Sequence, residues 1–314
     1  MRSPLLDRPG AVPADPPDEG IAAHYGDPFR EQRRLAAGDG LVDLSDRGVV
    51  TVTGPDRLGW LHSLTTQHLT ALPPGTPTEA LVLSPHGHVE HHLHVLDDGE
   101  TTWLHVEPGT AGALVGFLDS MRFMLRVEVA DVTDGHAVVH RAGRYGIVPR
   151  ERLAALPAQH GDPVGLLAHE ALRVAAGVPR LHRDTDQRTI PHEIGWLPVA
   201  VHLDKGCYRG QETVARVHNL GRPPRRLVLL HLDGSADVLP AAGTEVTLDG
   251  ARVGSLGTAV HHYELGPIAL ALVKRTVPDG ATLAVGGMNA AVEPLPGLSY
   301  GELAAPRARP RLGA

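Results

Sequence analysis

The sequence predicts an α+β protein built from two or three packed units. Its 314 residues exceed what one hydrophobic core usually supports, so more than one unit is expected. The first half mixes strand-like alternation with helix-like periodicity, whereas the last third contains short alternating strands. The 36 glycines and 27 prolines indicate many turns and favour a β-rich body.

Composition narrows the functional classes. Hydrophobic residues make up 42% of the chain and charged residues 21%, as in ordinary soluble globular proteins. The net charge of -7 excludes a sequence-wide basic field for nucleic acid, although a local basic patch remains open. A single cysteine cannot form an intrachain disulfide, and there is no signal-peptide pattern or run of eighteen apolar residues. We therefore expect a cytoplasmic protein.

Residues 1–40 are expected to be a flexible leader and connecting segment, because the first twenty are rich in proline and acid and lack periodicity. Order should begin near Leu41. Pro55 follows a turn glycine and opens a helix that carries Leu58 and Leu61. A second amphipathic helix has apolar residues at 114, 117, 118 and 121. Alternation predicts strands over 49–53, 80–84, 89–96 and 101–106.

The second half predicts one further helix and then a small barrel. Residues 164–176 are helical, and Gly177 with Pro179 ends the helix in the expected order. From Leu227 the chain reads as short strands, with Asp249-Gly250 as a two-residue hairpin turn. The expected organisation is an α+β region of two lobes over 41–226, a β-barrel over 227–300 and a tail over 301–314.

The motif Asp204-Lys205-Gly206-Cys207-Tyr208-Arg209-Gly210-Gln211-Glu212 contains the single cysteine. Helix-compatible residues follow Gly210, so Cys207 should lie just before a helix. The positive end of that helix and the nearby Lys205 would favour a thiolate. The alternative is a buried cysteine with a packing role, which is common for free cysteine. A purely structural turn would not need Lys205, Gln211 and Glu212, so the reactive thiol is preferred.

This motif resembles the KGCYxGQE signature of the YgfZ family, folate-binding proteins related to the aminomethyltransferase of the glycine cleavage system. Further matching segments occur in the same order, namely Gly177-Val178-Pro179, Ile190-Pro191-His192-Glu193, Arg216, Arg225-Arg226-Leu227 and Gly266-Pro267-Ile268-Ala269-Leu270-Ala271. With the hairpin at Gly87, the resemblance spans roughly Leu41 to Leu295.

The resemblance implies a GcvT-like, three-lobed fold, with ferredoxin-like α/β layers around a central folate cavity and a small C-terminal barrel. It implies binding of tetrahydrofolate or a derivative, and assistance to iron–sulfur cluster assembly or repair in client proteins, which affects tRNA modification through iron–sulfur enzymes. Cys207 and Lys205 would be catalytic, and Glu193 would anchor the pterin. The other cofactor-binding positions would be Tyr208, Gly206, Gly210, Gln211, Glu212 and Arg216.

The chain departs from the enzyme at one pair of residues. Aminomethyltransferases of this superfamily carry an Asp-Asp pair after the hairpin glycine, where this chain has His91-His92. Histidine cannot supply a fixed negative charge opposite a developing iminium. Glycine-cleavage chemistry is therefore not expected, and whether the protein is an enzyme is left open. A folate-dependent one-carbon transferase or demethylase is the alternative, and a folate-sensing module is a third possibility.

Histidines alternate along the hairpin at 86, 88, 92 and 94, with Glu90 among them. A His-x-His pair on a strand can supply two metal ligands, but a polar sheet face produces the same alternation without metal. We therefore assign no metal site. There is no Cys-x-x-Cys pair, so an iron–sulfur role would be exercised on another protein's cluster.

A basic stretch beside the motif contains Arg209, Arg216, Arg222, Arg225 and Arg226. Guanidinium groups pair well with carboxylates, which favours a site for the polyglutamate tail of folate. A solvated linker into the barrel is the close alternative. Direct RNA contact ranks last, because no aromatic stacking platform accompanies the arginines. No membrane partner is expected.

Overall fold

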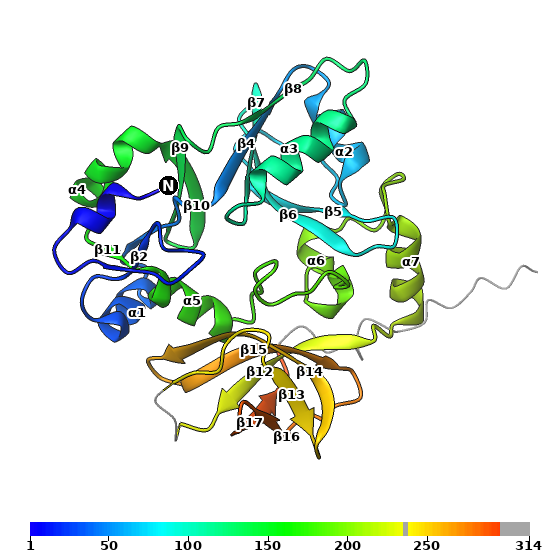
Figure 1. The fold of residues 1–314 in the computed structure, drawn as a ribbon. Helices are drawn as coiled ribbons and strands as arrows, with labels where there is room; N and C mark the ends of the chain where they lie inside the picture. Colours follow the sequence, from blue (N-terminus) through cyan, green and yellow to red (C-terminus); the bar gives the residue numbers. More distant parts are fainter. Residues whose placement is uncertain (235–237, 296–314) are drawn as a thin grey trace, which may run out of the picture.

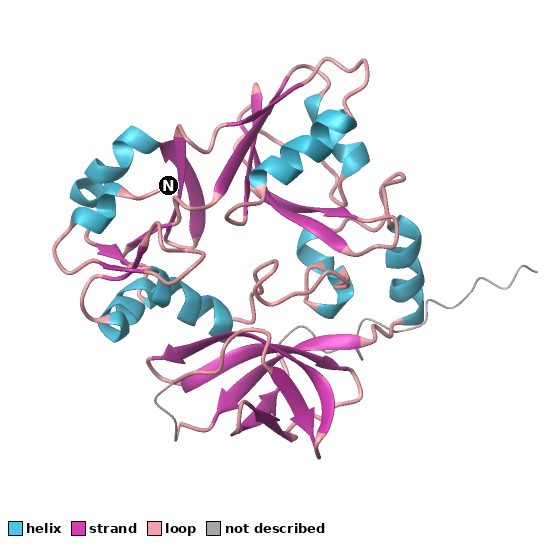
Figure 2. Cartoon of the chain, viewed as in Figure 1, coloured by secondary structure: helices cyan, strands magenta, loops and turns pink. Residues whose placement is uncertain are grey.

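The computed structural model describes residues 1–234 and 238–295, which form three lobes (Figures 1 and 2). The first lobe contains a five-stranded antiparallel sheet in the order β5-β6-β7-β4-β8. Its strands are β4 (Gly48–Thr53), β5 (Thr78–Leu83), β6 (Val89–Asp97), β7 (Thr101–Val106) and β8 (Glu128–Asp131). The strands expected over 49–53, 80–84, 89–96 and 101–106 are thus confirmed, whereas β8 is not apparent from alternation.

Two helices, α2 (Arg57–Leu64) and α3 (Ala111–Ser120), cover one face of this sheet. Alternate strand residues such as Val52, Val95 and Leu104 pack with Leu61 and Leu114 in a buried core. The alternation of the strands and the 3.6-residue period of the helices therefore bury their apolar sides against each other. The second face carries Leu81 and Leu83, which pack between the lobes, and the polar residues described below.

The second lobe contains a sheet in the order β10-β9-β3-β11, in which β11 is parallel to β3. The strands are β3 (Leu41–Asp43), β9 (His136–Arg141), β10 (Arg144–Pro149) and β11 (Pro163–Val164). Around them lie η2 (Arg150–Ala155), α4 (Leu156–His160) and α5 (Leu166–Ala175). The last of these helices confirms the prediction over 164–176, and it lies between this lobe and the barrel (Figure 1).

Residues 1–40 are structured, which corrects the expected flexible leader. They form η1 (Pro4–Asp7), β1 (Val12–Pro13), β2 (Ala22–His24) and α1 (Pro28–Ala36). Leu5 and Ile21 are fully buried in two cores of the second lobe. The Asp27 side chain caps α1 by accepting from the N–H groups of Phe29 and Arg30. The few apolar residues are widely spaced, so no periodic pattern reveals their burial.

The third lobe is a closed barrel in the order β12-β15-β14-β13-β16-β17. Its strands are β12 (Arg225–Leu232), β13 (Glu245–Leu248), β14 (Ala251–His262), β15 (Gly266–Lys274), β16 (Thr282–Val285) and β17 (Met288–Glu293). Asp249 and Gly250 both have positive φ, at 50° and 78°, as a type I′ turn between β13 and β14 requires. The predicted barrel and its turn are confirmed; the expected tail over 301–314 lies outside the described residues.

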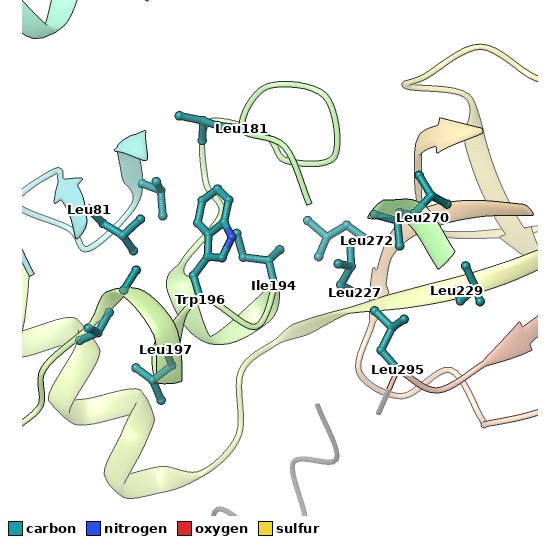
Figure 3. Packing of buried hydrophobic residues seen from close by; sticks show 14 of the residues in the cluster. Leu81, Leu181, Ile194, Trp196, Leu197, Leu227, Leu229, Leu270, Leu272 and Leu295 are labelled. Atoms are coloured by element: carbon teal, nitrogen blue, oxygen red, sulfur yellow. The ribbon is translucent and has the colours of Figure 1, made fainter. Parts of the chain in front are cut away.

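The lobes meet at a buried apolar cluster (Figure 3). Trp196 and Ile194 lie between Leu81 of the first sheet and the barrel residues Leu227 and Leu272. Three short helices surround this junction, namely η3 (Pro191–Glu193), α6 (Leu197–Ala200) and α7 (Gln211–Leu220). The segment that carries the cysteine motif is therefore built on a shared core.

In the part of the chain that the structure describes, every helix is too short or too polar to cross a membrane. The cytoplasmic location stays a prediction.

Candidate functional site

Cys207 lies in the loop between α6 and α7 and is exposed to solvent. The loop is held against the segment that follows α2, since the His202 N–H donates to the Thr66 carbonyl at 2.9 Å. As the sequence indicates, Gly210 caps α7, which starts at Gln211. The thiol is therefore accessible and close to a helix N-terminus, and it is not a buried packing residue.

Lys205 anchors one side of this loop. Its side chain is 8% exposed, and its ammonium donates to the carbonyls of His62, Thr65 (2.5 Å) and Gln67 (3.1 Å) at the end of α2. The Nζ atom also lies 5.1 Å from the ring centroid of the buried Tyr208. Burial lowers the pKa of Lys205 to about 8, so the ammonium still predominates at neutral pH. All three of its donors are engaged by carbonyls, which gives Lys205 a structural role; activation of the thiol stays a prediction.

Gly210 fixes the other side of the loop. It has a φ of 82°, and a Cβ atom there would lie 2.6 Å from the Ser84 carbonyl oxygen. Only glycine fits both the left-handed conformation and this approach to the β5–β6 turn. Gln211 reaches back to the Lys205 carbonyl at 3.4 Å. Cys207 is thus presented from a loop fastened to α2 on one side and to the first sheet on the other.

The Glu193 carboxylate is already hydrogen-bonded within the protein. Its side chain is 1% exposed, and the Arg225 guanidinium donates to both carboxylate oxygens at 2.8 Å. The Ile190 N–H donates to the second oxygen as well, at 3.1 Å. Glu193 therefore fastens η3 to the first barrel strand, and its role as pterin anchor stays a prediction.

Four arginines of the basic stretch are paired with carboxylates. Arg209 contacts Glu90, Arg216 contacts Glu212, Arg225 contacts Asp186 and Glu193, and Arg226 contacts Asp279. The pair between Arg216 and Glu212 lies on the exposed side of α7, whereas Glu193 is buried. The predicted cofactor-binding residues thus lie on α7, in the loop before it and in the buried turn η3, and their role in cofactor binding stays a prediction.

Sequence reasoning missed a cluster of rings on the second face of the first sheet. Strand pairing places Glu79 opposite His94, and His94 opposite His105, so one residue from each of β5, β6 and β7 forms a row. His92 lies two residues from His94 and contacts Glu79, with 2.7 Å between Nε2 and Oε2. Strand register could have revealed the row, since residues directly opposite point to one face.

The rings of this cluster stack closely. His92 stacks on Trp196 with centroids 4.2 Å apart, and His94 stacks on His105 at 4.3 Å. Tyr145 of β10 lies 4.7 Å from His94. Burial lowers the pKa of His94 and His105 well below the ordinary value, so these imidazoles are neutral at neutral pH.

The expected alternation of five polar residues on one side of the hairpin is corrected by a bulge. The register shifts between Val82 and Leu83, so Val89 pairs with Leu83 while His91 pairs with Val82. His86 and His88 lie in the turn before β6. Of the histidines named in the hairpin, His92 and His94 share the cluster, whereas His91 is buried on the opposite side of β6.

A solved structure of the glycine cleavage system aminomethyltransferase T from Bartonella henselae has the same fold. It aligns with a TM-score of 0.80 over 92% of this chain and 94% of that chain, at 17% identity. The family model described as the CAF17 C-terminal beta-barrel domain matches residues 225–296, which include all six barrel strands. The comparisons thus place this chain among proteins similar to CAF17, IBA57 and YgfZ, and the family model matches its C-terminal barrel.

Two curated relatives show the extent of the similarity. An iron–sulfur cluster assembly factor IBA57 homolog, mitochondrial, from Mycosarcoma maydis is 28% identical over 278 residues, which cover 76% of this chain and 68% of that protein. The tRNA-modifying protein YgfZ of Buchnera aphidicola is 34% identical over 93 residues, which cover 28% of each chain. The resemblance to YgfZ and the GcvT-like α+β fold are thereby confirmed.

Proposed function

We propose that this protein, which is similar to CAF17, IBA57 and YgfZ, assists iron–sulfur cluster assembly or repair in client proteins. The relative from Mycosarcoma maydis, which aligns over 76% of this chain, is named as an iron–sulfur cluster assembly factor homolog. Loss of the protein would then lower those tRNA modifications that iron–sulfur enzymes install.

The observation that carries the proposal is the position of Cys207. Its thiol is exposed, in a loop held by the buried Lys205 and by Gly210. Thiolates are the usual ligands of iron–sulfur clusters, and one cysteine can supply only one of the four that a cluster takes. Cys207 would therefore bind an iron of a cluster whose other ligands belong to a client or carrier protein.

A complementation experiment tests this role. Cells that lack the protein would receive the wild type, Cys207→Ser or Asn219→Ala, an exposed control on α7. We expect the wild type and Asn219→Ala to restore the activity of an iron–sulfur dehydratase, and Cys207→Ser to fail at equal protein levels. Full restoration by Cys207→Ser would contradict the proposed role of the thiol.

Tetrahydrofolate binding is the finer part of the proposal, and it is supported by the fold shared with an aminomethyltransferase. The Glu193 carboxylate already accepts two hydrogen bonds from Arg225 and one from the Ile190 N–H, so other groups would have to supply most contacts to the pterin. Titration of tetrahydrofolate into the purified chain, followed by intrinsic fluorescence, tests binding. Saturable binding supports the proposal, no binding removes folate from it, and turnover of methylene-tetrahydrofolate would instead favour the one-carbon transferase.

A further inference from the structure

The ring cluster contains three metal-binding side chains that strand register brings together. Glu79 on β5 and His94 on β6 are direct partners in the antiparallel pair, and His92 lies on the same face two residues earlier. One ligand atom from each of these residues lies within 4.8 Å of the other two. The side chains therefore converge on one point from two adjacent strands.

We infer that Glu79, His92 and His94 form a binding site for a divalent transition-metal ion of the Zn²⁺ or Fe²⁺ class. Two imidazoles and one carboxylate are a donor set that these ions take in proteins, with further positions left open to water or a ligand. The inference goes beyond cluster assembly on client proteins, because here the metal is held by the chain itself.

The distances fit such an ion after a small adjustment. The Glu79 carboxylate and the His92 Nε2 atom are 2.7 Å apart. Two ligands on a tetrahedral ion with bonds of about 2.0–2.1 Å lie roughly 3.3 Å from each other. For this pair a side-chain shift of about half an ångström suffices. The three ligand atoms lie within 4.8 Å of one another, so bringing His94 onto the same ion takes a side-chain movement of up to about 1.5 Å.

Neighbouring rings hold both imidazoles in place. His92 stacks on Trp196 and His94 stacks on His105 with an interplanar angle of 9°. The Arg47 Nε–H donates to His105 Nδ1 at 3.2 Å and fixes that ring in turn. A site supported in this way on strands is preorganised, so little ordering entropy opposes metal binding.

A hydrogen bond between Glu79 and His92 accounts for only two of the three groups. It does not explain why a further imidazole is placed within reach of both ligand atoms. His105, which is 4% exposed, also leaves Nε2 without a hydrogen-bond partner among the described residues. Because His105 Nδ1 accepts from Arg47, the neutral ring carries its proton on Nε2. Buried polar groups are seldom left unpaired, so this N–H favours an acceptor in the cluster, such as a water bound to the metal ion.

Metal titration of the full chain, purified without a histidine tag and stripped with a chelator, tests the site. Co²⁺ would be followed by its visible absorption, and Zn²⁺ by competition. We expect one tight equivalent in the wild type. Glu79→Gln and His94→Asn should weaken binding by at least about tenfold, because even outer-shell changes cost 10–100-fold.

His86→Asn is the matched control, since His86 is an exposed histidine in the turn of the same hairpin. It should bind Co²⁺ as the wild type does. Glu79 is one-third exposed and glutamine has the same shape, so Glu79→Gln should fold; an unchanged urea midpoint checks this. Equal affinity in the wild type, Glu79→Gln and His94→Asn would overturn the inference, as would the absence of a stoichiometric site in the wild type.

Discussion

Replacing Lys205 with methionine tests whether the structural role of this residue is as large as its contacts indicate. The ammonium donates to three backbone carbonyls at the end of α2, and the side chain is 8% exposed. Hydrogen bonds to charged groups contribute about 1.5–3 kcal/mol each, so the gross loss is roughly 5–9 kcal/mol. Removing a buried ammonium also removes its desolvation cost of several kcal/mol. We therefore expect a net loss of about 2–4 kcal/mol in the free energy of unfolding.

Urea unfolding followed by tryptophan fluorescence measures this loss. With a urea m value of about 3 kcal/mol/M, the midpoint should fall by roughly 1 M. Lys274→Met is the matched control, because the sequence has only these two lysines and Lys274 is exposed with one bond to the Arg252 carbonyl. The control should stay close to the wild type. An unchanged midpoint for Lys205→Met would refute the anchoring role.

Three further predictions concern stability. Gly210→Ala should lower the free energy of unfolding by about 2–4 kcal/mol, because alanine strains the left-handed backbone and its Cβ meets a carbonyl oxygen. Gly206 has open space around it, so Gly206→Ala should stay within about 0.5 kcal/mol of the wild type; thermal melts of the two variants measure the difference. Glu193→Gln weakens a buried pair, but Arg225 keeps Asp186, so it should cost about 1.5–3 kcal/mol in urea unfolding, whereas the exposed Glu212→Gln should change little. Burial lowers the pKa of His91 from 6.5 to about 4, so the unfolded chain binds more protons in this window and stability should fall by roughly 3 kcal/mol as the pH drops through it; His91→Asn should flatten that pH dependence.

The sequence predicts those parts of the fold whose signals are local. Alternation marks β4 to β7, and Asp249-Gly250 marks the hairpin between β13 and β14, because neighbouring residues decide both. The first 40 residues give no such signal. Leu5 packs on Ala137 and Leu153, more than a hundred residues away, so its burial depends on contacts that no local pattern records.

In the candidate site, too, the sequence predicts the features that depend on neighbouring residues and misses those that depend on distant ones. The motif locates an exposed thiol before a helix, since glycine placement and helix composition lie within a few residues of Cys207. Lys205 and Glu193 bind partners at the end of α2 and on β12, far from the motif in sequence. The motif alone therefore does not reveal that both side chains make structural contacts. The row of Glu79, His94 and His105 can be recognised only when the register of the three strands is known. A bulge in the β5–β6 pair shifts that register and cannot be foreseen from alternation.

The buried Gln32 of α1 joins the first helix to the third lobe. Its amide donates to the His261 carbonyl at 2.9 Å and accepts from the Tyr263 N–H at 2.8 Å. During synthesis on the ribosome, the amino-terminal helix must therefore wait for more than two hundred further residues before it can make these two bonds. In nascent chains stalled before residue 261, α1 can already pack on α5, but Gln32 still lacks both of its partners and the helix is not yet tied to the barrel.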